Sequence, residues 1–90
     1  MIFVSYSWRD QSVIRDLEGR LRDLGLPVWV DYRNLRPDFE IATQLDLAIR
    51  DCQLFLAIQG LRHAPSAWVR QELLLARTHG KRVLRFTVVS

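Results

Sequence analysis

Residues 54–58 read LFLAI, and this unbroken apolar run decides the fold class. A strand covered on both faces has no solvent side, so it is apolar at every position and not only at alternate ones. Strands of this kind belong to parallel sheets that carry helices on both faces. The run is therefore predicted to be the third strand of such a sheet and to lie near its centre, ending at Gln59-Gly60.

Helical patterns lie on both sides of this run. Apolar residues form one stripe over residues 12–24, a second stripe over residues 41–52, and a third helix is expected over residues 67–79. Side chains that cap helices, and glycines that end them, stand at the expected boundaries. The predicted caps and terminating glycines are Asp10, Gly25, Asp38, Ser66 and Gly80.

Extended patterns separate the helical ones. They cover residues 2–6 (IFVSY), 27–31 (PVWVD) and 82–89, with polar loops predicted at residues 32–37 and 61–65. The order strand-helix-strand-helix-strand-helix-strand, with connections long enough for helical crossovers, predicts parallel strands in a three-layer α/β fold. We expect one domain over residues 1–90, with Trp29 and Cys52 buried in its core.

The charges and the single cysteine exclude several classes of protein. Thirteen Lys and Arg against ten Asp and Glu give a net charge of +3, and the basic residues alternate with acidic ones along the chain. This alternation is typical of solvated helix faces, so neither nucleic acid nor a membrane surface is an expected partner. One cysteine allows no intrachain disulfide, and no apolar stretch is long enough to cross a membrane. With no secretory signal in view, we expect a cytoplasmic protein.

In open α/β sheets ligands bind beyond the carboxyl ends of the strands. The residues that this rule selects are Tyr6, Ser7, Trp8, Asp10, positions 31–39, positions 59–66 and positions 68–72. Among them Trp68 and Glu72 are four residues apart, so both lie on one face of the last helix. A partly desolvated carboxylate there could accept hydrogen bonds from sugar hydroxyls or stabilise a developing cation. The alternative is an exposed Glu72 paired with Arg70 or Arg77.

Other kinds of chemistry lack their residues. The two histidines are sixteen residues apart with no acidic or cysteine cluster at ligand spacing, so no metal is expected. No glycine-rich phosphate loop occurs. Asp10 is explained as a helix cap and Asp31 as a polar loop residue, while Trp8 either stacks on a ligand or packs on the first helix. A phospho-accepting receiver domain would need an aspartate where Gln59 stands.

These segments together resemble a TIR (Toll/interleukin receptor) domain of the prokaryotic type. The matching pieces are residues 3–7 with Asp10, residues 24–31, residues 35–37, Ala48-Ile49, residues 66–73 and residues 80–83. The resemblance implies a flavodoxin-like sheet with strand order 2-1-3-4-5, and an assembly loop after the second strand that contains Leu35, Arg36, Pro37 and Asp38. It also implies a fifth strand and a last helix, for which these ninety residues have no counterpart, so a truncated domain with an open edge beside residues 83–89 is expected.

The resemblance further implies an activity and a site. Many TIR domains cleave NAD+ at the nicotinamide glycosidic bond with a glutamate in a W-x-x-x-E motif, which Trp68 and Glu72 match. Glu72 is then the catalytic residue, and the substrate contacts are Ser7, Trp8, Asp31, Phe39 and Trp68. NAD+ is the substrate, no cofactor or metal is needed, and the products are nicotinamide with ADP-ribose or a cyclic ADP-ribose isomer. The alternative is a non-catalytic module that acts by homotypic assembly with other TIR domains, and an innate-immune or antiphage signalling role is implied for either.

Overall fold

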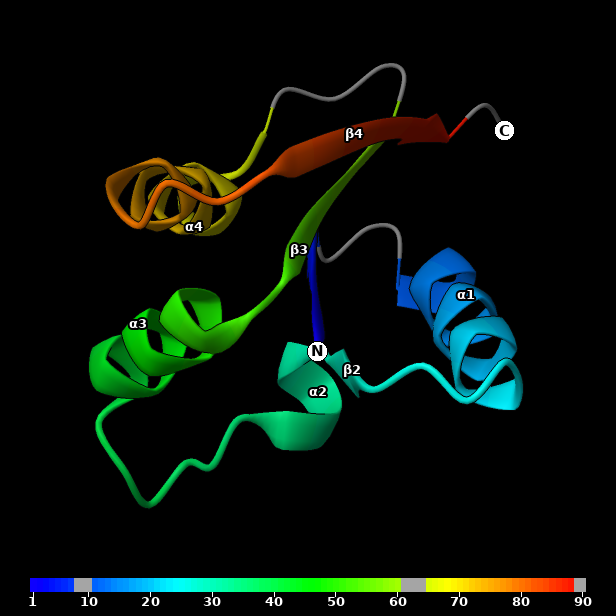
Figure 1. Ribbon diagram of the computed structural model, residues 1–90, viewed down its shortest axis with the longest axis horizontal. Helices are drawn as coiled ribbons and strands as arrows, with labels where there is room; N and C mark the ends of the chain where they lie inside the picture. Colours follow the sequence, from blue (N-terminus) through cyan, green and yellow to red (C-terminus); the bar gives the residue numbers. More distant parts are fainter. Residues whose placement is uncertain (8–10, 61–64, 89–90) are drawn as a thin grey trace.

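The computed structural model describes residues 1–7, 11–60 and 65–88, and its strands form one parallel sheet (Figure 1). The elements are β1 (Ile2–Tyr6), α1 (Gln11–Asp23), β2 (Val28–Trp29), α2 (Asp31–Asn34), α3 (Ile41–Asp51), β3 (Leu54–Gly60), α4 (Ala67–Thr78) and β4 (Val83–Val88). The strand order is β2-β1-β3-β4, and every pair is parallel. The apolar run at residues 54–58 is therefore an inner strand, and the predicted α/β fold with this strand order is confirmed.

Helices cover both faces of the sheet. Figure 1 shows α3 and α4 on one side of the strands and α1 on the other. Two separate clusters of buried apolar side chains fill the spaces between the layers, one beneath α3 and α4 and the other beneath α1. Burial of these side chains is the main stabilising term of the fold.

One row of aromatic side chains runs across the sheet on the α3 and α4 side. The Phe3 ring stacks on Trp29 at 4.8 Å and on Phe55 at 5.2 Å between ring centroids, and the three residues are register partners on neighbouring strands. Trp29 is half-buried against this core, and Cys52 is fully buried in it. The prediction for Cys52 is confirmed, and that for Trp29 is confirmed in part, since Trp29 packs against the core but is only half-buried.

The second strand and the loop after it differ from the prediction. The strand has only two residues, and Asp31–Asn34 form a single helical turn where residues 32–37 were expected to be a loop. The Val30 carbonyl accepts the backbone N–H groups of Arg33 and Asn34, while the Asn34 side chain accepts the Val30 N–H. This closed set of hydrogen bonds turns the chain before it reaches the loop.

The third strand is longer than predicted. Gln59 and Gly60 continue β3 because they pair with Thr87 and Val88 of β4. The apolar run ends at Ile58, whereas the hydrogen-bonded ladder and the burial of the strand continue to Gly60.

The predicted helix boundaries are partly confirmed. The Ser66 hydroxyl accepts the Val69 N–H at 3.2 Å and caps α4, and Gly25 and Gly80 adopt positive φ angles of 77° and 64°. The prediction for Asp38 is wrong: Glu40 is the N-cap residue of α3, and Asp38 instead forms an exposed ion pair with Arg36 at 3.6 Å. Asp10 lies outside the described residues.

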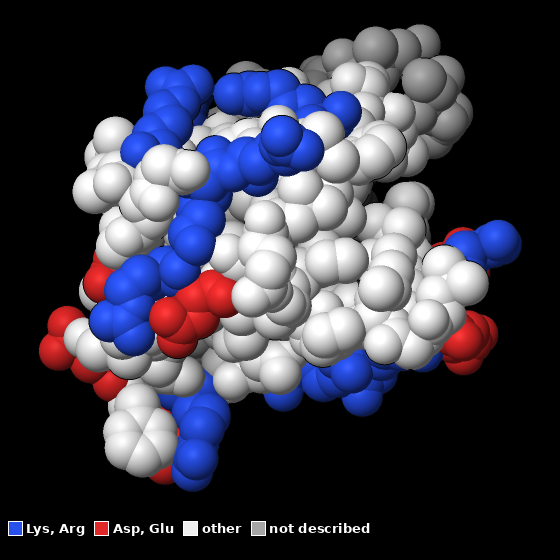
Figure 2. Space-filling view, in the orientation of Figure 1, with Lys and Arg blue, Asp and Glu red and all other residues white. Residues whose placement is uncertain are grey.

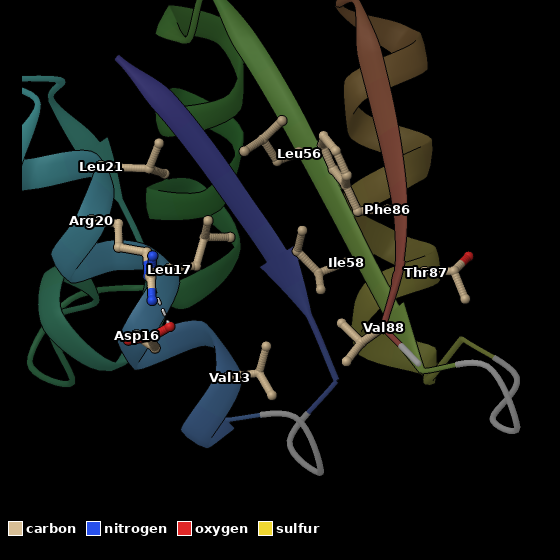
Figure 3. Close-up of a pocket in the computed structure, with 10 residues that line it drawn as sticks. All are labelled: Val13, Asp16, Leu17, Arg20, Leu21, Leu56, Ile58, Phe86, Thr87 and Val88. Atoms are coloured by element: carbon tan, nitrogen blue, oxygen red, sulfur yellow. Dashed lines mark hydrogen bonds and ion pairs between the residues drawn. The ribbon is translucent and has the colours of Figure 1, made fainter. Parts of the chain in front are cut away.

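The outer strand β4 is mostly exposed, and a hollow lies between it and α1 (Figure 3). This hollow has a volume of about 430 Å³ and is lined by apolar side chains of α1, β3 and β4, beside the exposed Arg20–Asp16 ion pair. In the described part of the chain, no helix is long and apolar enough to cross a membrane.

Candidate carboxylate site

Glu72 is buried between α4 and the sheet, with 1% of its surface exposed. Ser66 starts the helix, and Val69, Leu73 and Ala76 follow at helical spacing on the face that packs against the sheet. Glu72 belongs to the same buried face. Burial excludes the alternative in which Glu72 is an exposed helix residue paired with Arg70 or Arg77.

Ser5 of β1 is the direct partner of Glu72. Its hydroxyl donates to a Glu72 carboxylate oxygen at 2.8 Å, and both side chains are buried. Side chains alternate along β1, so Phe3 and Ser5 face α4 while Val4 and Tyr6 face the other layer. The sequence prediction chose Ser7 and missed Ser5, although a serine on the inner face of a buried strand is a usable signal for a buried polar partner.

Burial controls the protonation of Glu72. It raises the pKa of the Glu72 carboxyl to about 8, the Ser5 hydrogen bond opposes this rise, and the negative charge of Asp31 adds to it. Near neutral pH the side chain is therefore mostly protonated. A carboxyl whose pKa lies close to the working pH can change its charge when a ligand arrives.

Asp31 lies at the carboxyl end of β2, where α2 begins. Its Oδ1 atom accepts the Tyr6 hydroxyl at 2.7 Å and the Tyr32 backbone N–H at 2.7 Å. Burial, the hydrogen bond to Asp31 and the Asp31 charge all raise the pKa of Tyr6, so its hydroxyl keeps its proton and remains the donor. A hollow of about 160 Å³ at this edge is lined by Tyr6, Gln11, Asp31, Tyr32 and Leu35. The structure thus forms two hydrogen-bonded pairs near the carboxyl ends of β1 and β2: Ser5 with Glu72 on the α4 side of the sheet, and Tyr6, which faces the other layer, with Asp31.

The other predicted substrate contacts differ in burial and in the groups that they pack against. Ser7 follows β1 directly and is half-buried, and Trp68 is half-buried against the core beneath α3 and α4. Phe39 is 55% exposed, with the Arg36 guanidinium 4.8 Å from its ring centroid, and it does not line the 160 Å³ hollow. Trp8 lies outside the described residues.

The predicted assembly loop is held from one side by α3. The Gln44 side chain accepts the Arg36 N–H at 2.8 Å and donates to the Arg36 carbonyl at 2.6 Å and to the Phe39 carbonyl at 3.1 Å. Leu35 turns toward the hollow, whereas Arg36, Pro37 and Asp38 are exposed. One end of the loop therefore borders the carboxylate site, and the rest faces solvent.

Two further features lie apart from the carboxylates. Within residues 1–7, 11–60 and 65–88, no three His, Cys, Asp or Glu side chains come close enough to hold a metal ion. Figure 2 shows basic side chains gathered over α4 and β4, where Arg70, Arg77 and Arg85 line a hollow of about 420 Å³. Basic residues that are separated along the sequence therefore lie together in a basic region of the folded chain.

A parallel sheet with helices on both faces defines an open α/β domain, the class of protein in which ligands bind at the carboxyl edge of the sheet. Within this class, the family model for the TIR domain matches residues 2–89, so the chain belongs to the TIR domain family. The resemblance inferred from the sequence is confirmed. The search of curated protein sequences gives no match.

Two solved structures are similar to the chain. The TIR domain of the Toll-related receptor TRR-2 from Hydra magnipapillata superposes with a TM-score of 0.78 at 16% identity, covering 93% of this chain and 66% of that one. The CMP N-glycosidase BcmB from Clostridium botulinum superposes with a TM-score of 0.69 at 26% identity, covering 96% of this chain and 67% of that one. The chain therefore spans about two thirds of the length of either structure.

Proposed function

We propose that this TIR domain cleaves the N-glycosidic bond between nicotinamide and ribose in NAD+, with Glu72 as the catalytic residue. The observation that carries the proposal is the Glu72 carboxyl, buried at the carboxyl edge of the sheet and hydrogen-bonded to Ser5 at 2.8 Å. A buried carboxyl without a charged partner costs stability, and such groups are typical of functional sites. NAD+ is the substrate that the resemblance to TIR domains implies.

The chemistry of the bond suits such a group. When the bond between ribose C1′ and the nicotinamide nitrogen breaks, its electron pair leaves with nicotinamide and positive charge develops on the ribose. An ionised Glu72 next to C1′ stabilises that charge, and the positive ring of bound NAD+ favours release of the Glu72 proton. Water then adds to C1′ and loses a proton, which gives ADP-ribose, whereas attack by the adenine gives a cyclic isomer.

A known N-glycosidase of similar structure supports the reaction class. The Clostridium botulinum protein is named for cleavage of an N-glycoside, CMP, and it is 26% identical to this chain. NAD+ and CMP share a ribose joined to a nitrogen heterocycle. The class of bond is thus supported by structural similarity, and the choice of NAD+ rests on the family resemblance.

The direct test is release of nicotinamide from NAD+ by the purified chain, measured by chromatography. We expect Glu72→Gln to lower kcat at least 100-fold, because the amide cannot carry the stabilising negative charge. Glu40→Gln is the matched control, since Glu40 is an exposed glutamate and the charge change is the same. Equal rates for wild type and Glu72→Gln would overturn the assignment, and release of cytosine from CMP in place of nicotinamide would change the substrate.

The pH profile gives an independent test of the same residue. If the ionised carboxylate is the active form, kcat/KM for NAD+ rises with pH and levels off above about 8, the pKa of Glu72 in the free chain. A profile that falls through this pH would show that Glu72 acts as a proton donor.

The exposed apolar residues after the assembly loop favour a second candidate function, homotypic assembly. Phe39 and Ile41 are 55% and 42% exposed beside the loop formed by Leu35, Arg36, Pro37 and Asp38. Light scattering during size-exclusion chromatography of wild type and Phe39→Ser tests this candidate, with Leu24→Ser, another exposed apolar residue, as the control. Self-association that needs Phe39 and occurs without NAD+ cleavage would favour the interaction module.

A further inference from the structure

Glu18 is a buried carboxylate outside the proposed catalytic group. The buried polar side chains in the described part of the chain are Ser5, Glu18 and Glu72, and Ser5 and Glu72 are bonded to each other. Glu18 instead belongs to α1, on the opposite face of the sheet, and only 3% of it is exposed. A buried charge of this kind needs partners.

The partners of Glu18 join two helices. Arg22 of α1 donates to Glu18 Oε2 at 2.8 Å, Arg33 of α2 donates to the same atom at 2.7 Å, and the Tyr32 hydroxyl donates to Oε1. The Arg15 guanidinium lies 4.5 Å from the centroid of the Tyr32 ring. Two of the three donors come from α2, so Glu18 holds α2 against α1.

The helix α2 depends on such contacts. It has four residues and no side-chain cap at its start. One turn of helix fixes several backbone dihedrals for very few hydrogen bonds, so it is not stable without tertiary contacts. The position of every α2 residue is therefore set by what α2 packs against.

The first residue of α2 belongs to the carboxylate site. Asp31 accepts the Tyr6 hydroxyl, and its negative charge is one of the causes that raise the pKa of Glu72. Tyr32 is the next residue in the chain, and its ring packs edge-on against the Tyr6 ring at 6.4 Å between centroids. A displacement of Tyr32 or Arg33 is thus passed directly to Asp31.

We propose that Glu18 is a positioning residue of the carboxylate site: it fixes α2 through Tyr32 and Arg33, so that Asp31 stays beside Tyr6 at the edge of the 160 Å³ hollow. A buried ion cluster adds little net stability compared with apolar packing, and its clearest benefit is a unique arrangement of the groups it joins. The proposal rests on the proposed function in so far as Glu72 is catalytic.

The test substitutes Glu18→Gln, which keeps the shape of the side chain and removes its charge. In the described part of the chain the polar groups that act on Glu72 are Ser5 on β1 and Asp31 on α2. If α2 shifts, the Asp31 charge moves away and the midpoint of Glu72 titration falls by roughly half a unit or more. Carbon-13 NMR of labelled glutamate carboxyls measures this midpoint without any substrate, with Glu72→Gln used to assign the signal.

The matched control is Asp16→Asn, on the same helix. It removes one carboxylate from an exposed ion pair with Arg20, so the Glu72 midpoint is expected to stay unchanged. Arg33→Gln removes a single partner of Glu18 from a more exposed position and serves if Glu18→Gln does not fold. Its effect on the midpoint should disappear in the Glu18→Gln background.

Activity gives the second readout. We expect Glu18→Gln to lower kcat for nicotinamide release about 10-fold and to shift the pH profile in the same direction as the NMR midpoint. If Glu18→Gln and Arg33→Gln lower only the melting temperature and leave the Glu72 midpoint in place, the role is structural and the proposal is wrong. If wild type cleaves no NAD+, the proposed function fails, while the NMR midpoint still decides whether Glu18 positions Asp31.

Discussion

Two glutamates are buried on opposite faces of one sheet, and their surroundings give them opposite properties. Glu18 accepts hydrogen bonds from Tyr32, Arg22 and Arg33, whereas the hydrogen bond found for Glu72 comes from the neutral hydroxyl of Ser5. Burial alone would raise the pKa of Glu18, but its three donors outweigh burial and hold its pKa below the usual value. Burial dominates at Glu72 and raises its pKa to about 8.

Burial alone therefore does not decide whether a carboxyl group is charged or what role it has. A buried carboxylate with two arginine partners stays charged at neutral pH and ties elements together. A buried carboxyl with no cationic partner among the described residues keeps its proton and can ionise when a positive group arrives. The first arrangement fixes the positions of the elements it joins, and the second costs stability and is typical of a functional site.

The largest expected effect on stability comes from Glu72→Gln. The folded chain holds a proton on Glu72 up to pH 8, whereas the unfolded chain releases it above pH 4.5, so folding is disfavoured between these values. We expect the substitution to raise the free energy of unfolding by up to about 3 kcal/mol at pH 7, since each pKa unit is worth about 1.4 kcal/mol. Urea denaturation at several pH values measures the gain, which should disappear below pH 4.5. A loss of stability at pH 7 would contradict the predicted contrast between the two glutamates.

Glu18→Gln is expected to act in the opposite direction. It removes the charge that pairs with Arg22 and Arg33, and both arginines reach solvent, so a loss of about 2 kcal/mol is expected at pH 7. The folded pKa of Glu18 lies below the unfolded value, so its contribution is present above pH 4.5 and is lost as pH falls through the folded pKa. Thermal melts from pH 3 to pH 7 check this, with Asp16→Asn as the exposed control. Equal losses at both ends of the range would exclude an ionic contribution.

The smallest expected effect on stability comes from the N-cap of α4, one of the two helices that carry the acidic groups of the site. α4 carries Glu72 and has the Ser66 cap, whereas α2 carries Asp31 and has no side-chain cap. Ser66→Ala is expected to lower the free energy of unfolding by about 1 kcal/mol, because the Val69 N–H loses its acceptor. Ser12→Ala, an exposed serine in α1, is the control. If Ser66→Ala also lowered the pKa of Glu72, the cap would fix the position of Glu72 as well as the stability of α4.

Local patterns predicted most of the secondary structure because each depended on neighbours in the chain. The run at residues 54–58 predicted a covered strand, and Ser66, Gly25 and Gly80 marked helix ends through hydrogen bonds or backbone angles a few residues away. The α2 turn could not be predicted in this way, since Asp31–Asn34 lack a cap and are held by Glu18 from another helix. The prediction for Asp38 was wrong because the N-cap of α3 is Glu40, two residues further along the chain. The Asp38 side chain instead pairs with Arg36.

The sequence by itself determined the parallel α/β fold, the TIR family and Glu72 as the candidate catalytic residue, because apolar periodicity, turn residues and the W-x-x-x-E spacing are all local. The packing of the folded chain shows that Ser5 is its partner, that Asp31 helps to raise its pKa, and that Glu18 is bonded to Tyr32 and Arg33 of the helix that begins at Asp31. The physical reason is distance along the chain: Ser5 and Glu72 are 67 residues apart, so nothing but the packing of α4 on β1 brings them together.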